Sequence, residues 1–212
     1  MLKKISMSVA LLAAVCSGNS CADTTSPSNQ FFYAGLMTGY ANVDWSSVVS
    51  TDTATQFLSS GNPVSADGTG VLAGIDAGYQ FNPYLSMEAE YIQLPDTQLI
   101  FLFDGYNQGT LVNSHLTMAA LTFKVIAPLP QSQFSFFVDA GPAYQYQTNS
   151  IKSIGTWAPT FGGGLLYRIN SHWQSEAAFQ YAPGTGKSIE MPLLAYVPEV
   201  YAGTLKFDYI FN

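Results

Sequence analysis

Nine charged residues share one phase of the alternating segments that run through this chain. They are Asp76, Glu88, Glu90, Lys124, Asp139, Arg168, Glu176, Lys206 and Asp208. Acids and bases on one face of neighbouring strands could form an ion path or a gate. They could also pair with one another as a structural network, because a buried charge without a partner is costly. We favour the structural interpretation, since both signs of charge occur on the same phase.

The order of the segments predicts which of these charges meet. Neighbouring strands should bring together Glu88 and Lys124, Lys124 and Asp139, Arg168 and Glu176, and Glu176 and Lys206. Most of the nine residues lie close to the short connections of the chain. We therefore expect the network in that half of the molecule.

Other residue types that could do chemistry give weaker signals. His115 and His172 fall at opposite ends of the predicted strands, so they cannot form one metal site. No recognisable catalytic arrangement surrounds either of them. The run 162–164 is all glycine but lacks the Lys-Ser/Thr ending and the following helix of a phosphate loop, so close strand packing explains it better. We expect no enzyme, no cofactor and no metal ion.

The elements that must position these residues are strands. From Val71 to Phe81, apolar residues occupy one phase, and small or polar residues such as Gly74 and Asp76 occupy the other. A period of two residues is typical of a strand with two different faces. Eight such segments are predicted: 31–45, 71–81, 85–91, 117–125, 136–141, 161–168, 173–181 and 201–211. The residue pattern does not decide which phase of the first segment faces inward.

The connections between these segments alternate in length. Those at 82–83, 128–133 and 170–171 are short, and those at 46–69, 95–114, 145–156 and 182–200 are long and polar. Pro142 follows directly on 136–141, towards the outer end of the fifth strand, and should cause a bulge or an early end of pairing there. Residues 43–45 and the long connections could form a surface patch.

The N-terminal residues have the pattern of a secretory signal peptide. Lys3 and Lys4 precede an apolar run, and Ser20, Cys21 and Ala22 form a small-x-small cleavage site. We expect a signal peptide at 1–22 and one domain at 23–212, with a lipid-modified Cys21 as the less favoured alternative. Cleavage leaves a mature chain of 212 − 22 = 190 residues. It contains no cysteine, so it cannot form a disulfide bond. The mature charge of 5 − 14 = −9 argues against nucleic acid as a partner.

The amino-acid composition favours a protein that folds in a membrane. Charged residues make up 10% of the sequence, against about 25% in soluble domains. Aromatic residues gather near the ends of the predicted strands, as in interfacial girdles, and the phase opposite the large apolar residues is rich in small side chains. The strict alternation of short and long connections is typical of outer-membrane barrels, with short turns in the periplasm. Both ends of the mature chain should then lie on the periplasmic side.

The signal peptide, the eight alternating segments and the final stretch 205–211 resemble the small outer-membrane barrel family. That family includes opacity-type surface antigens, OmpX-like proteins and the transmembrane part of OmpA. The resemblance covers nearly the whole mature chain and implies an all-β, eight-stranded antiparallel transmembrane barrel with up-and-down order, located in the Gram-negative outer membrane. It also implies that the assembly machinery reads the terminal aromatic segment, beyond which only Asn212 follows.

These patterns predict a structural and surface-interaction protein that acts through its extracellular loops. Its expected partners are outer-membrane lipid and lipopolysaccharide, the assembly machinery, and host or environmental surface ligands. A narrow pore for ions or small solutes is the alternative, although eight strands leave an interior about filled by side chains. A lipid-modifying enzyme is a third possibility, for which His115 is the one histidine near the outer leaflet.

Overall fold

The computed structural model describes residues 30–46, 65–101, 110–149, 153–184 and 197–211, and the predicted signal peptide lies outside them. These residues form ten strands. They are β1 (Phe31–Asp44), β2 (Ser65–Asp67), β3 (Thr69–Asn82), β4 (Leu85–Gln93), β5 (Thr97–Phe101), β6 (Thr110–Pro128), β7 (Phe134–Asn149), β8 (Ser153–Arg168), β9 (Trp173–Ala182) and β10 (Glu199–Phe211). No helix in the described ranges is long and apolar enough to cross a membrane.

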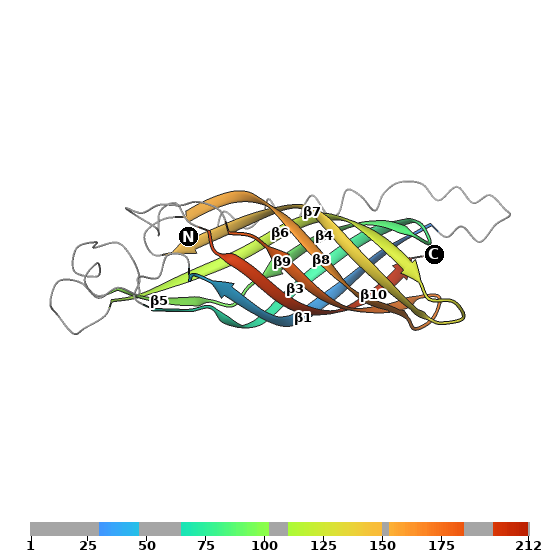
Figure 1. The fold of residues 1–212 in the computed structure, drawn as a ribbon, viewed down its shortest axis with the longest axis horizontal. Helices are drawn as coiled ribbons and strands as arrows, with labels where there is room; N and C mark the ends of the chain where they lie inside the picture. Colours follow the sequence, from blue (N-terminus) through green and yellow to red (C-terminus); the bar gives the residue numbers. More distant parts are fainter. Residues whose placement is uncertain (1–29, 47–64, 102–109, 150–152, 185–196, 212) are drawn as a thin grey trace.

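The strands close into a barrel (Figure 1). Around the ring the order is β1, β3, β4, β6, β7, β8, β9 and β10, every pairing is antiparallel, and β10 pairs with β1. The two short strands are not members of this ring of eight. β5 pairs with β6 beyond the end of β4, and β2 pairs with β5. The prediction of an eight-stranded antiparallel barrel with up-and-down order is confirmed.

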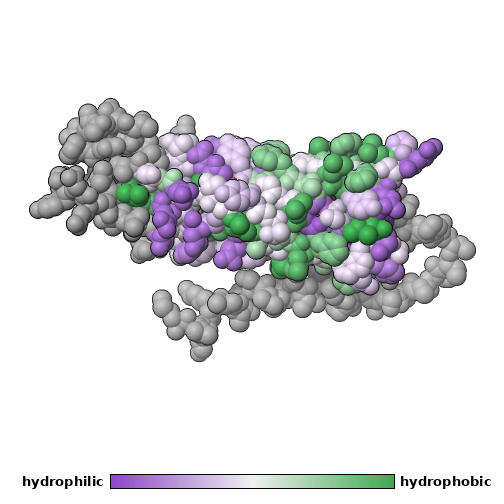
Figure 2. All heavy atoms as spheres, turned by 90° about the horizontal axis from the view of Figure 1, so that it is seen from below, coloured by the Kyte–Doolittle hydropathy of each residue, from purple (hydrophilic) through white to green (hydrophobic). Residues whose placement is uncertain are grey.

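The outer face of the barrel is apolar. Leu36 and Val71 are each 70% exposed, and Leu205 is 60% exposed. Their neighbours along each strand point into the barrel and are buried, which also settles the phase of β1: its odd-numbered residues face inward. Hydrophilic side chains gather towards the end that carries β5 and again near the opposite end, and most hydrophobic ones lie between the two (Figure 2). This surface matches a hydrocarbon solvent along the turn-proximal part of the barrel.

Aromatic rings gather near both ends of the barrel wall. At the end with the short turns, ring centroids lie 4.5 Å apart in Phe32–Tyr79, 4.6 Å in Phe134–Tyr167 and 4.8 Å in Trp173–Phe207. Towards the other end, the pairs are Tyr144–Trp157 and Tyr181–Tyr201. These rings fit the two interfacial belts of a membrane protein, where an amphipathic ring meets the headgroups.

The strands run further at the β5 end than predicted. The segment 95–114 was expected to be a loop, but β5 and the first residues of β6 pair within it. The expected loop 145–156 is likewise wrong at its edges, because β7 continues to Asn149 and β8 begins at Ser153. A strand of about 9–11 residues spans a bilayer, whereas β7 has 16. These extensions therefore stand beyond the membrane, where outward residues no longer need to be apolar.

The predicted effect of Pro142 is also wrong. β7 continues through it without a bulge, and Pro142 lies opposite Pro159 of β8. On the β6 side, Gly141 and Pro142 are not paired, and pairing resumes in the same register, from Phe123–Ala140 to Ala120–Ala143. The backbones come very close beside the proline, because a Cβ at Gly141 would collide with the Leu121 carbonyl oxygen.

Candidate functional site

A cluster of five charged side chains crosses the lumen of the barrel; we call it the ionic layer. It comprises Glu88 and Glu90 of β4, Lys124 of β6, Glu176 of β9 and Lys206 of β10. The Lys124 Nζ lies 2.9 Å from Glu88 Oε2 and 2.5 Å from Glu176 Oε2. Lys206 Nζ donates to Glu88 and Glu90 and lies 3.3 Å from Glu176 Oε1. Every one of these side chains is at least 96% buried.

Strand register explains how these five residues meet. Glu176 lies directly opposite Lys206 across the β9–β10 ladder. Glu88 and Lys124 sit on neighbouring strands two positions apart, because Glu88 pairs with Thr122. The contact between Lys124 and Glu176 instead crosses the lumen, since β6 and β9 are not neighbours. The ionic layer therefore ties opposite walls of the barrel together.

Neutral polar groups complete the ionic layer. The Tyr33 hydroxyl donates to Glu88 Oε2 at 2.7 Å, and Gln180 Nε2 donates to Glu90 Oε2 at 2.8 Å. The Tyr33 ring fits because β3 carries a glycine opposite it: a Cβ at Gly78 would lie inside the ring. The sequence pattern alone did not single out Tyr33 or Gln180, because the phase of β1 was open and a glutamine carries no charge.

Two predicted members, Asp76 and Asp208, lie beside the ionic layer. Both are buried, and Gln174 Nε2 donates to Asp208 Oδ2 at 2.9 Å. Within the described residues, neither carboxylate oxygen of Asp76 has a hydrogen-bond partner.

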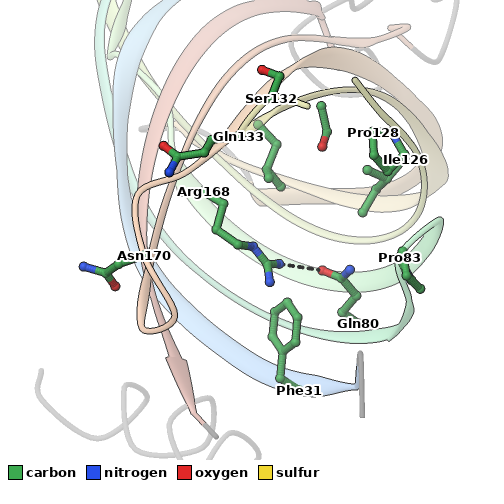
Figure 3. Close-up of a pocket in the computed structure, with 11 residues that line it drawn as sticks. Phe31, Gln80, Pro83, Ile126, Pro128, Ser132, Gln133, Arg168 and Asn170 are labelled. Carbon is green, nitrogen blue, oxygen red and sulfur yellow. Dashed lines mark hydrogen bonds between the residues drawn. The ribbon is translucent and has the colours of Figure 1, made fainter. Parts of the chain in front are cut away.

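Two other predicted members, Asp139 and Arg168, form no salt bridge with the ionic layer among the described residues. Asp139 faces Lys124 across the β6–β7 ladder, but the ion pairs of Lys124 in the described part of the chain go to Glu88 and Glu176. The structure also does not pair Arg168 with Glu176: Arg168 lies opposite Gln174, and Glu176 lies opposite Leu166. Arg168 reaches into the mouth of the barrel at the short-turn end (Figure 3).

Towards the β5 end, a large apolar cluster fills the lumen; we call it the apolar plug. It comprises Met37, Ala41, Val43, Trp45, Leu72, Ile92, Leu94, Leu99, Leu116, Met118, Ala120, Ala143, Ala182, Val197, Val200 and Ala202. Val43 and Trp45 are each 2% exposed. The interpretation of residues 43–45 as a surface patch is therefore wrong for these two side chains, which pack inside the barrel.

The two histidines lie at opposite ends of the molecule. His115 Nδ1 pairs with Asp96 Oδ1 on the surface near the β5 end. His172 lies in the β8–β9 turn, with its Nδ1 2.9 Å from Ser171 Oγ. In the described ranges, no three His, Cys, Asp or Glu side chains group in a way that could hold a metal ion. The glycines 162–164 lie within β8, where their positions pair with β7 and β9.

A closed eight-stranded barrel with an apolar outer wall, aromatic belts and a cluster of charged side chains in its interior defines an outer-membrane β-barrel protein. A family model described as the outer membrane protein beta-barrel domain matches residues 7–202, and this chain belongs to that family. Comparison with curated proteins finds no significant sequence match.

Solved structures of small outer-membrane barrels are similar in fold. The outer membrane protein OprG from Pseudomonas aeruginosa aligns with a TM-score of 0.56 at 13% identity, covering 87% of this chain and 97% of that one. Neisserial surface protein A aligns with a TM-score of 0.51 at 15% identity, covering 84% and 95%. The outer membrane protein AlkL, solved in lipid bilayers, aligns with a TM-score of 0.51 at 15% identity, covering 92% and 96%. At these identities the likeness concerns the fold.

Proposed function

We propose that this protein is a structural and surface-interaction protein of the outer membrane, in which the barrel is a closed anchor and the chain beyond its outer end contacts partners. The observation that carries this proposal is the filled lumen. The ionic layer ties the walls together in the short-turn half of the barrel, and the apolar plug lies towards the β5 end. Large plug side chains such as Leu72, Leu99 and Met118 are at most 1% exposed, which disfavours the alternative of a narrow pore.

The proposal includes no catalytic role. The pair of His115 and Asp96 is the arrangement nearest to a catalytic one, because an acid can orient a histidine that acts as a base. A nucleophile must also lie within hydrogen-bond reach of that histidine. Among the described residues, the hydrogen bond of His115 goes to Asp96. A lipid-modifying enzyme is therefore the less favoured alternative.

The first test is conductance in planar lipid bilayers. The wild-type protein should give no stable stepwise currents, because the apolar plug blocks the lumen. A variant with Leu72→Ala, Leu99→Ala and Met118→Ala removes large, fully buried side chains from the plug and should raise the current. Stable steps from the wild-type protein would support a pore and overturn the closed-anchor proposal.

The second test concerns the segments at the outer end. Deleting residues 47–64 or 102–109 spares every described strand and the plug residue Leu99. The barrel should still fold, while adherence of cells displaying the protein to epithelial cells and to polystyrene should fall. Lipopolysaccharide binding by the purified protein should be tested in parallel, because outer-membrane lipid is a proposed partner through the wall. Unchanged adherence after both deletions would argue against the loops as the interacting part.

A further inference from the structure

The mouth of the barrel at the short-turn end contains a cavity of about 430 Å³. Strands β1 and β3 and all three short turns contribute to its wall, through residues that include Phe31, Gln80, Pro83, Ser132, Arg168 and Asn170 (Figure 3). In this class of protein the short turns face the periplasm. The cavity is therefore at the opposite end from the segments assigned above to surface contact.

Arg168 is held in this cavity by neutral groups. Its guanidinium carbon lies 4.7 Å from the centroid of the Phe31 ring, and Nη2 donates to Gln80 Oε1 over a long 3.4 Å. Within the described residues, no carboxylate forms a salt bridge with Arg168, and Glu88, Glu90 and Glu176 pair instead with Lys124 and Lys206. A guanidinium has five N–H donors, so most of them are free to meet a ligand in the cavity.

The surroundings indicate which anion would fit. Among the described residues that line the cavity, Arg168 is the only charged one, and Ile126 and Leu166 are also in the wall. One guanidinium neutralises one negative charge, and two of its N–H groups can donate in parallel to both oxygens of a carboxylate. The apolar side chains favour a ligand with an apolar body. The volume falls in the range of about 300–1,000 Å³ that is common for small-molecule sites.

We propose that the periplasmic mouth of this barrel is a binding site for small carboxylates with an apolar or aromatic body, with Arg168 clamping the carboxylate. The Phe31 ring packs against the Arg168 guanidinium, and the Gln80 side chain of β3 accepts a hydrogen bond from its Nη2. The ligand carboxylate accepts the remaining donors, and its apolar part lies against Ile126 and Leu166. This site is independent of the surface-interaction proposal, because it lies at the other end of the barrel.

The test uses nuclear magnetic resonance of the ¹⁵N-labelled protein in detergent micelles. Arg168 is the only arginine in the sequence, so its Nε–Hε signal is a unique probe. Benzoate should shift this signal and the side-chain amide of Gln80 in a saturable way. Benzamide has the same size without the charge and should shift neither. Inorganic phosphate should not saturate the site over the same concentration range.

Two variants complete the test. Arg168→Gln should abolish the response of Gln80 to benzoate, and Arg168→Lys, which keeps the charge but loses the fork, should weaken binding about tenfold or more. Heat-dependent gel migration checks that each variant folds. If Arg168→Gln does not fold, the weakened binding of benzoate by Arg168→Lys is the result that tests the proposal. Equal shifts with benzoate and benzamide, tighter saturation by phosphate, or an unchanged response in a folded variant would each overturn the proposal.

Discussion

Replacing Lys124 with methionine should destabilise the barrel, because it leaves buried carboxylates without their cation. Methionine keeps much of the length of lysine, so the change removes charge without opening a large cavity. Glu176 loses its closest partner, at 2.5 Å, and keeps only the 3.3 Å contact with Lys206. Glu88 loses a 2.9 Å partner but keeps Lys206 and the Tyr33 hydroxyl.

The expected size of the effect follows from this burial. Breaking a buried ion pair by removing one partner costs about 3–5 kcal/mol. With a loss of about 4 kcal/mol and a urea slope of about 2 kcal/mol/M, the unfolding midpoint should fall by about 2 M. The measurement is urea unfolding in lipid vesicles, followed by fluorescence of the tryptophans on the barrel wall.

A matched double variant separates the lost ion pair from any general damage. Adding Glu176→Gln to Lys124→Met removes the stranded charge, so the double variant should be more stable than the sum of the two single effects by about 1–3 kcal/mol. A strictly additive result, or a Lys124→Met midpoint equal to that of the wild type, would refute the account of the ionic layer as a stabilising network.

Three further predictions test the membrane face, the lumen and the N-terminus. Leu36→Lys places a charge on the lipid face and should lower the free energy of unfolding by about 2–4 kcal/mol. Asn42→Lys, six residues nearer the outer end, should lower it by about 0–1 kcal/mol, and urea unfolding in vesicles compares the two. Gly78→Ala should cost about 1–3 kcal/mol in the same assay, because its Cβ would displace the Tyr33 ring. Mass spectrometry of membrane-extracted protein should find a mature N-terminus at Asp23, and a retained, lipid-modified cysteine would contradict it.

The strands that cross the membrane were predictable because lipid imposes a simple rule on them. Lipid-facing residues must be apolar, so Ile75 and Asp76 fall on opposite faces of β3 with no ambiguity. The rule fails in β5 and the start of β6, which extend beyond the membrane and were taken for a loop. In β1 it fails for a different reason: the apolar plug makes the inner face as apolar as the outer one, and Met37 and Val43 face inward while Leu36 and Tyr40 face out.

The ionic layer was only partly predictable for a reason of geometry. Neighbouring strands constrain each other through register, so the contacts of Glu88 with Lys124 and of Glu176 with Lys206 follow from strand order. The contact between Lys124 and Glu176 spans the lumen, and no local pattern encodes a distance across a closed ring. The position of Arg168 depends on strand stagger, since a shift of two residues moves it from Glu176 to Gln174.

The span of the ionic layer along the chain has a consequence for folding kinetics. Lys206 contacts Glu88 across 118 positions, and Lys124 contacts Glu176 across 52. The contact between Lys206 and Glu88 joins β10 to β4, so it forms only when the last strand closes against the first. Interactions that are absent from the transition state affect the unfolding rate and leave the folding rate nearly unchanged. Loss of the contact between Lys206 and Glu88 should therefore shorten the lifetime of the inserted barrel while leaving its rate of insertion almost as it was.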